Sequence, residues 1–316
     1  MLYPKSTLSA AFYLVCLLIK TGEGTCGKPF FKPIIPSTEG NGNRILYGVE
    51  ARKHSHPWQV FISIRVDDYR KRCGGSLIHW KDENASGLVL TAAHCVIDTT
   101  YFTEPTVWEQ IAYFFSSLFK GTINGPVANT SDVHVYLGAH NIKTLDPSAI
   151  RVGVIAIATG EFNKINQVDD FALLKLEREI AYNEFIQGIC LPDGKHDMPP
   201  AESPCLVTGW GLKEDEKPSS ILQQLEVPIV DGQHVNEPLF DKNRMICSHG
   251  KAKGAVPTNG DSGGPLACLK NDTFVIYGVV SFSIVEDCSG RTNMTIFMKL
   301  SHYMKWIRET IARLES

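Results

Sequence analysis

The stretch Asn259-Gly260-Asp261-Ser262-Gly263-Gly264-Pro265-Leu266 places a serine beside glycines, with an acid directly before it and a proline shortly after it. Small residues let the backbone turn sharply and bring its N–H groups close to a bound carbonyl group. A short G-x-S-x-G pattern also occurs in ordinary glycine-rich turns, so that pattern alone identifies no nucleophile. The longer run is far more specific and predicts a nucleophilic Ser262. Such a serine needs a histidine as general base and an acid that orients this histidine.

Two upstream segments offer candidates for the base and the acid. Leu90-Thr91-Ala92-Ala93-His94-Cys95 contains His94, and Asp169-Asp170-Phe171-Ala172-Leu173-Leu174 opens an apolar strand with two acids. A histidine beside a cysteine is usually structural, and an acid at the start of a strand is common. With Cys73-Gly74-Gly75-Ser76-Leu77-Ile78 and Thr208-Gly209-Trp210-Gly211, however, and in the order His, Asp, Ser, these segments resemble the trypsin and chymotrypsin family of serine proteases.

This resemblance extends from about Arg44 to Ser316 and implies an all-β fold of two antiparallel six-stranded β-barrels with a C-terminal helix. The N-terminal barrel is expected at about 45–182, the C-terminal barrel at about 183–300 and the helix at 301–315. The chain has short β-branched strands at 60–64, 87–90, 133–137 and 152–157 and no alternation with long helices. Near its end, one helical face carries Tyr303, Trp306, Ile307, Ile311 and Leu314.

The resemblance also assigns roles to the site residues. Ser262 is the expected nucleophile and His94 the expected general base, while Asp170 orients the histidine, with Asp169 as the less favoured acid. The N–H groups of Gly260 and Ser262 are expected to form the oxyanion hole. Catalysis would proceed through an acyl-enzyme, and no cofactor or metal is implied.

The first residues predict export from the cell. Lys5 precedes a short apolar run at 8–19, which is typical of a secretory signal peptide at 1–24, with an uncleaved anchor as the alternative. No later segment is long and apolar enough to span a membrane, and the net charge of −3 argues against nucleic acid as a partner. Four sequons predict glycosylation of a secreted surface, at Asn84, Asn129, Asn271 and Asn293.

Residues 25–44 are rich in Gly, Pro and Lys and are expected to form a pro-segment. In the family, cleavage after a basic residue frees an apolar N-terminus, so Arg44 and Ile45 mark the expected activation site. The new Ile45 ammonium group would pair with Asp261, because a buried acid beside the nucleophile needs a cation. An ordinary strand entry after a basic residue is the alternative.

Nine cysteines fit an exported protein, and removal of Cys16 with the signal peptide leaves eight. The resemblance supports three disulfides, Cys26–Cys190, Cys73–Cys95 and Cys205–Cys268. Parity suggests that Cys247 and Cys288 pair with each other, and two free thiols are the alternative. Zinc-type cysteine pairs are absent from the sequence, and the segment at the place of the family's calcium loop, 138–151, carries Asp146 as its one carboxylate.

The expected specificity pocket departs from that of trypsin. Val256 stands six residues before the nucleophile, where trypsin has an acid, and a valine cannot offset the desolvation of a substrate Arg or Lys. We therefore expect cleavage after small or medium uncharged residues. Activation at Arg44 would then require another protease of trypsin-like specificity. The expected lining residues are Val256, Pro257, Ser281, Phe282, Ser283 and Thr295.

A long insertion at about 97–132 follows His94, and its apolar residues have helical spacing. It is either a lid or exosite over the cleft, or a helix that only packs on the barrel. The sequence thus predicts a secreted serine endopeptidase, made as a zymogen, that acts on proteins or peptides. Protein inhibitors are further candidate partners. The alternative is a catalytically silent homologue that binds proteins. An α/β-hydrolase is excluded because its catalytic residues follow the order Ser, acid, His.

Overall fold

The fold is described here from a computed structural model. It describes residues 26–35, 48–81, 84–98, 125–163, 167–199, 203–213, 215–230, 240–249, 256–284 and 294–316. The predicted signal peptide, Arg44 and Ile45, Cys288, Asn293 and most of the 97–132 insertion lie outside these residues.

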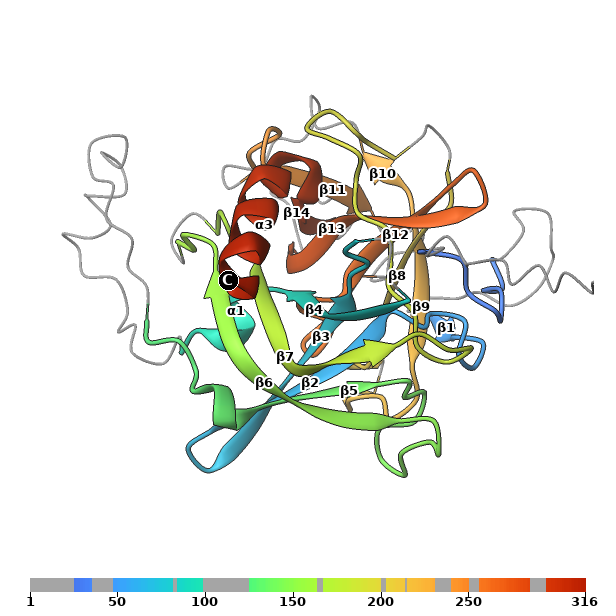
Figure 1. The fold of residues 1–316 in the computed structure, drawn as a ribbon. Helices are drawn as coiled ribbons and strands as arrows, with labels where there is room; N and C mark the ends of the chain where they lie inside the picture. The colour runs from blue at the N-terminus through green and yellow to red at the C-terminus, as the bar shows by residue number, and fades with distance from the viewer. Residues whose placement is uncertain are drawn as a thin grey trace, which may run out of the picture.

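The first half of the chain forms a closed barrel of six antiparallel strands (Figure 1). In barrel order these are β2 (Gln59–Val66), β3 (Tyr69–Leu77), β4 (Ala85–Thr91), β7 (Ala172–Ala181), β6 (Ile150–Thr159) and β5 (Val133–Leu137). Alternate residues of β2, namely Val60, Ile62 and Ile64, are buried in the core of the barrel. The N-terminal barrel and its strands are therefore confirmed.

The second half forms an eight-stranded antiparallel sheet curved into a half-barrel. Its order is β1 (Val49–Glu50), β9 (Gln223–Val227), β8 (Cys205–Gly209), β12 (Pro265–Lys270), β13 (Thr273–Ile284), β14 (Met294–Lys299), β11 (Met245–His249) and β10 (Ile229–Val230). The two-barrel fold is confirmed. The strand count differs from the prediction because two strands of two residues each, β1 and β10, flank the six longer ones.

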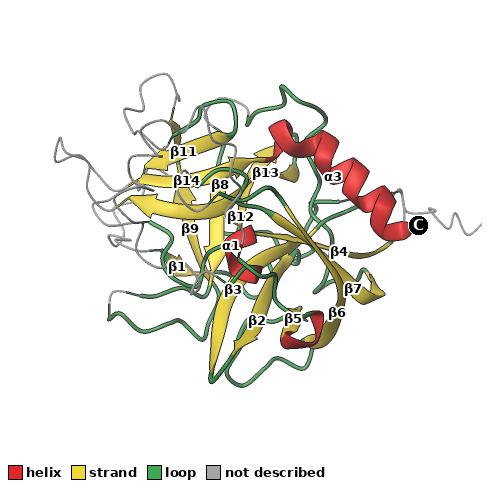
Figure 2. Cartoon of the chain, turned by 90° about the vertical axis from the view of Figure 1, so that its left-hand side faces the viewer, coloured by secondary structure: helices red, strands yellow, loops and turns green. Residues whose placement is uncertain are grey.

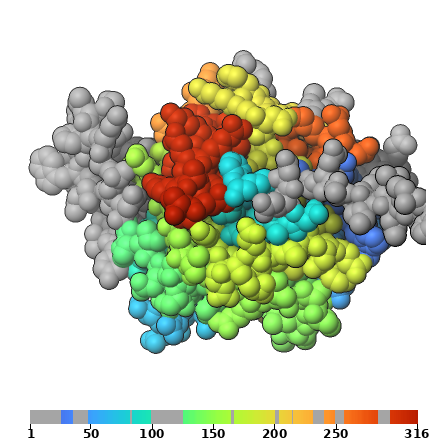
Figure 3. Space-filling view, in the orientation of Figure 1, coloured from blue at the N-terminus to red at the C-terminus, as the bar shows by residue number. Residues whose placement is uncertain are grey.

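Three helical segments complete the described elements: α1 (Ala93–Val96), the 3₁₀ turn η1 (Thr130–Asp132) and α3 (Leu300–Glu315). α3 starts one residue before the predicted helix. It lies on the surface of the molecule, red in Figure 3, and contacts both β13 of one sheet and β7 of the other (Figures 1 and 2). Within the described ranges, no helix has the length and apolar character needed to cross a membrane.

Residues 26–35, part of the expected pro-segment, pack against the rest of the protein. Cys26 forms a disulfide with Cys190, and the Gly27 amide donates a hydrogen bond to the Gly188 carbonyl group. The Gly27 carbonyl group accepts from Phe274 N at 2.8 Å, and a Cβ at Gly27 would lie 2.0 Å from Phe274 O. This close approach, at φ +64°, requires glycine.

Two further disulfides, Cys73–Cys95 and Cys205–Cys268, form as expected. Cys247, in contrast, is a free thiol, so its suggested pairing with Cys288 is not formed in this structure. Cys247 lies fully buried within β11, and its Sγ is 3.6 Å from Met294 Sδ. Burial raises the pKa of its thiol to about 12.

Candidate active site

The Ser262 loop is held by backbone turns between β11 and β12. Asp261 N donates to Thr258 O and Gly264 N donates to Asp261 O, each at 2.9 Å. Gly263 has φ +81°, and a Cβ there would lie 2.1 Å from Thr91 Oγ1. The loop therefore needs glycine after the serine because it presses against the strand that leads to His94.

His94 and Asp170 meet because their strands are neighbours. α1 follows β4, Asp170 precedes β7, and Thr91 of β4 pairs with Ala172 of β7. His94 Nδ1 lies 2.7 Å from Asp170 Oδ2, and the His94 backbone N donates to Asp170 Oδ1 at 2.8 Å. Since Nδ1 faces the carboxylate, Nε2 of the neutral ring is left as the proton acceptor.

Asp170 is completely buried and has a third partner in the second sheet. Ser281 Oγ of β13 donates to Asp170 Oδ2 at 2.5 Å. Burial alone would raise the pKa of this carboxyl group, but His94 and the Ser281 hydroxyl group together hold the pKa below its usual value. Asp170 is therefore an ionised acid that both sheets position.

The neighbouring acid, Asp169, points elsewhere. Its Oδ1 accepts a hydrogen bond from Tyr303 OH at 2.8 Å, and its Oδ2 lies 3.3 Å from Arg244 Nη1. Of the two acids that open this strand, only Asp170 contacts His94.

A cleft between the two sheets brings His94 and Ser262 together, and both side chains line it. Within the described part of the chain, no hydrogen bond joins Ser262 Oγ to His94. Such bonds are often long in the absence of substrate. The cleft is also lined by Phe162, Gln167 and Leu212, which sequence analysis missed.

Phe162 and Gln167 lie just after β6, and no motif marks them, although Phe162 packs 6.5 Å from the His94 ring, centroid to centroid. Lys71 of β3 was also missed. This half-buried lysine donates through Nζ to the His94 carbonyl group, and burial lowers the pKa of its ammonium group.

The amides of Gly260 and Ser262 face no described acceptor, whereas the amides of Asp261, Gly263 and Gly264 are all hydrogen-bonded. Gly260 has φ +104°, which favours glycine. Two unbonded N–H groups beside a serine can stabilise a developing oxyanion.

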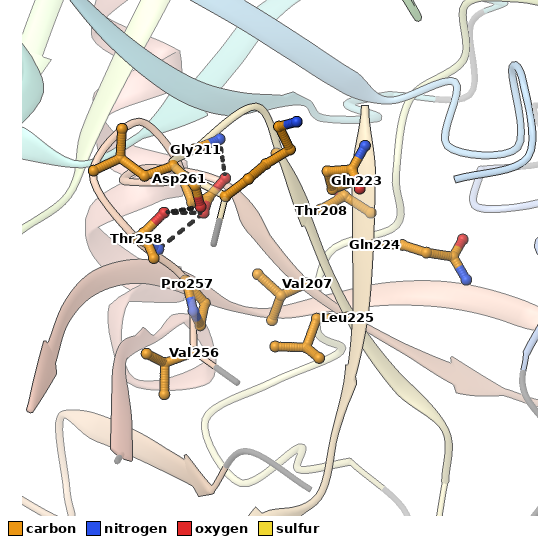
Figure 4. Close-up of a pocket in the computed structure, with 13 residues that line it drawn as sticks. Val207, Thr208, Gly211, Gln223, Gln224, Leu225, Val256, Pro257, Thr258 and Asp261 are labelled. Carbon is orange, nitrogen blue, oxygen red and sulfur yellow. Dashed lines mark hydrogen bonds between the residues drawn. The ribbon is translucent and has the colours of Figure 1, made fainter. Parts of the chain in front are cut away.

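Asp261 lies on the other side of the same loop (Figure 4). Its carboxylate accepts from Gly211 N at 2.8 Å and from Thr258 N at 2.9 Å. The carboxylate is enclosed, because a Cβ at Gly209 or Gly211 would lie 2.0 or 2.2 Å from its oxygens. Among the residues described, no cation pairs with it, and burial raises its pKa. A small cavity bordered by Val207, Leu225 and Val256 adjoins it.

Five of the six expected pocket residues line the cleft, namely Val256, Pro257, Ser281, Phe282 and Ser283. The sixth, Thr295, is fully buried behind Ser283 on the adjacent strand β14. Ser283 Oγ donates to Pro257 O at 2.9 Å and lies 3.3 Å from Thr295 Oγ1. The Ser283 hydroxyl group thus connects two walls of the cleft.

No group of three potential metal ligands lies close together in the described ranges. Asp146, the carboxylate of the 138–151 segment, accepts from the amides of His140 and Asn141 and pairs with Lys53 at 2.6 Å. Its oxygens serve this loop, and these contacts lower its pKa to about 2 even though burial acts to raise it. Asn84, Asn129 and Asn271 are exposed.

Comparisons with known proteins agree with this geometry. The sequence profile of the family described as Trypsin matches residues 45–111 and 124–307. Bovine chymotrypsin-C is 31% identical over 297 residues, covering 91% of this chain and 94% of that protein. Mouse chymotrypsin-C is 30% identical over 300 residues, covering 91% and 94%, and the rat protein is 31% identical over 299 residues, covering 90% and 93%.

Proposed function

The chain belongs to the trypsin family and is a serine endopeptidase, and we propose that Ser262, His94 and Asp170 are its catalytic triad. The observation that carries this proposal is the 2.7 Å contact between His94 Nδ1 and Asp170 Oδ2, beside a cleft that both His94 and Ser262 line. This is the arrangement that general-base activation of a serine requires.

In the proposed mechanism, Ser262 Oγ attacks the scissile carbonyl carbon while His94 Nε2 takes the hydroxyl proton. The oxyanion is stabilised by the Gly260 and Ser262 amides, each worth about 2.7–4 kcal/mol. The tetrahedral intermediate then collapses, the C–N bond breaks, and His94 delivers its proton to the leaving amine. Water, deprotonated by His94, hydrolyses the acyl-enzyme and regenerates Ser262.

We further propose that the protein is made as a zymogen. Supporting this, Asp261 lacks a cation among the described residues, and the family profile begins at residue 45. Cleavage after Arg44 by another protease of trypsin-like specificity would free the Ile45 ammonium group to pair with Asp261. The Cys26–Cys190 disulfide would keep the cleaved pro-segment attached.

The cleft supports a preference for small or medium uncharged residues before the scissile bond. Val256 offers no charge to a basic side chain, and the Ser283–Pro257 hydrogen bond occupies the space between two walls. The natural substrates we propose are proteins or peptides outside the cell, after removal of the signal peptide at 1–24. Protein inhibitors and glycans at the four sequons belong to the same proposal.

The direct test is hydrolysis of a peptide library by the chain after cleavage at Arg44, with Ser262→Ala as the control. We expect cleavage after small or medium uncharged residues and no cleavage by the Ser262→Ala variant. An inactive, correctly cleaved wild type would instead favour a catalytically silent homologue that binds proteins through the same cleft. Efficient cleavage after Arg or Lys would overturn the proposed specificity.

The insertion at 97–132 remains a prediction with two alternatives, a lid or exosite and a helix packed on the barrel. Deleting its central part distinguishes them, because a lid or exosite would change the cleavage of folded proteins more than that of short peptides.

A further inference from the structure

We propose that Tyr303 of the C-terminal helix is a positioning residue for the catalytic acid, acting through Asp169. This inference rests on the proposed triad and extends its machinery to α3. We call the three residues Asp169, Tyr303 and Arg244 the Asp169 lock.

The backbone at Asp169 is in an unusual conformation. Its φ of +57° lies in the left-handed region, which L-residues other than glycine rarely occupy. Asp and Asn tolerate this region better than other side chains, and the conformation persists where the surroundings hold it. Because Asp170 is the next residue, the turn at Asp169 determines the direction in which the catalytic carboxylate points.

Tyr303 and Arg244 hold this turn from outside the barrel. Tyr303 OH donates to Asp169 Oδ1 at 2.8 Å, while Arg244 Nη1 contacts Asp169 Oδ2 at 3.3 Å. The tyrosine is only 6% exposed, whereas the arginine side chain is 40% exposed. The bond from the buried tyrosine is therefore the one that solvent screens least.

The residue on the other side of Asp170 is held by the same tyrosine. The Phe171 ring lies 4.1 Å from the Tyr303 ring and 4.7 Å from the Trp306 ring, between centroids. Phe171 N also donates to Asp169 O at 2.9 Å, which closes the turn around Asp170. Tyr303 thus contacts both neighbours of the catalytic acid, one through its hydroxyl group and the other through its ring.

This matters because Asp170 must satisfy three donors at once. Its two oxygens accept from His94 N, His94 Nδ1 and Ser281 Oγ, all within 2.8 Å. A small rotation of the backbone at Asp169 would lengthen the contact with His94 Nδ1. The imidazole would then be less firmly oriented, and its protonated form in the transition state less stabilised.

The experiment uses the Arg44-cleaved full chain and compares Tyr303→Phe with Tyr277→Phe. Tyr303→Phe keeps the ring against Phe171 and removes only the hydroxyl group. Tyr277 is a matched control, since its buried hydroxyl group also donates to a carboxylate, that of Asp197 at 3.3 Å, but it does not line the cleft. Rates are normalised to the number of sites that a fluorophosphonate titrates.

For Tyr303→Phe we expect kcat to fall about tenfold with KM within about twofold of wild type. The acid limb of the kcat/KM profile should move to lower pH, because a displaced carboxylate stabilises protonated His94 less. Tyr277→Phe should change neither quantity. Equal kcat and equal acid limbs in the two variants would overturn the lock.

A second pair of variants keeps the test decisive if Tyr303→Phe folds poorly. Asp169→Asn retains an oxygen acceptor and tolerance of positive φ, so its activity should stay within about threefold of wild type. Asp169→Ala loses both and should fall at least about tenfold. Equal activity of the two would contradict the inference. A wild type that never reacts with the fluorophosphonate would mean that the proposed triad itself has failed.

Discussion

Ser281 and Ser283 stand two residues apart on β13, yet their hydroxyl groups have different partners. Ser281 donates across the interface to Asp170, while Ser283 donates to Pro257 in the loop before the nucleophile. The first contact belongs to the charge network of the triad and the second to the shape of the cleft. Substitutions at these two positions should therefore affect rate and specificity separately.

Replacing Ser283 with glycine should widen the cleft, because it removes the group that connects Pro257 and Thr295. We expect kcat/KM for substrates with Phe or Leu before the scissile bond to rise about tenfold relative to substrates with Ala or Val. A peptide library profiled with both enzymes measures this ratio. An unchanged ratio would mean that the Ser283 hydroxyl group does not limit the cleft.

Replacing Ser281 with alanine should instead lower the rate for every substrate. Asp170 would lose one donor to its charged form, a hydrogen bond worth about 1.5–3 kcal/mol, so kcat/KM should fall by roughly 10- to 100-fold. The preference among substrates should stay the same. A change of preference without loss of rate would contradict the role assigned to Ser281.

At this scale, the motifs around His94, Asp170 and Ser262 were enough to predict which side chains meet. What they did not predict were partners from distant parts of the chain. Tyr303 and Arg244 reach Asp169 only after both sheets and α3 have packed together. No local pattern marks such contacts, because they depend on tertiary structure rather than on spacing along the chain.

At the scale of elements, the strands were predictable because each carries β-branched residues between turns. The two-residue strands β1 and β10 were not, since segments this short have no measurable period. The pairing of Cys247 with Cys288 followed from parity alone. Parity does not detect that Cys247 lies in the interior of β11, fully buried against Met294.

Cys247 gives a test of this correction. With its pKa raised to about 12 by burial, the thiol should not react with iodoacetamide in the folded protein at pH 8, but should react after unfolding without reductant. Mass mapping of the peptide that contains Cys247 measures this, with Cys247→Ala as the blank. Failure to react after unfolding would show that Cys247 is in a disulfide after all.

At the scale of the whole molecule, buried His56 connects distant segments. Its Nε2 lies 3.0 Å from Gln224 Oε1 of β9, and Gln224 Nε2 donates to Ile34 O of the segment 26–35. Burial lowers the pKa of His56 from 6.5 to about 4. The unfolded chain therefore binds a proton more readily than the folded chain between these pH values.

It follows that His56 contributes stability that is fully present above pH 6.5 and is lost as the pH falls toward 4. At about 1.4 kcal/mol per pKa unit, the loss should approach roughly 3 kcal/mol. Urea unfolding at several pH values, compared between wild type and His56→Gln, measures it. The difference should be smaller for His134→Gln, since His134 is partly exposed. Equal pH dependence of wild type and His56→Gln would contradict this account.

Activation also belongs to the whole molecule, because it joins residue 45 to the Ser262 loop. Asp261→Asn should be cleaved at Arg44 as fast as wild type yet gain about 100-fold less activity, since the new ammonium group would lack its buried partner. Peptide hydrolysis before and after cleavage measures the gain. A variant that activates normally would remove Asp261 from the activation step.

The central claim is that Ser262 is a nucleophile activated by His94 and Asp170. Its most direct test is mass mapping of the Arg44-cleaved chain after reaction with a fluorophosphonate. The account predicts a single adduct on the peptide that contains Ser262, formed at a rate that falls by several orders of magnitude in His94→Ala. No adduct in the cleaved wild type, or equal labelling of the His94→Ala variant, would contradict it.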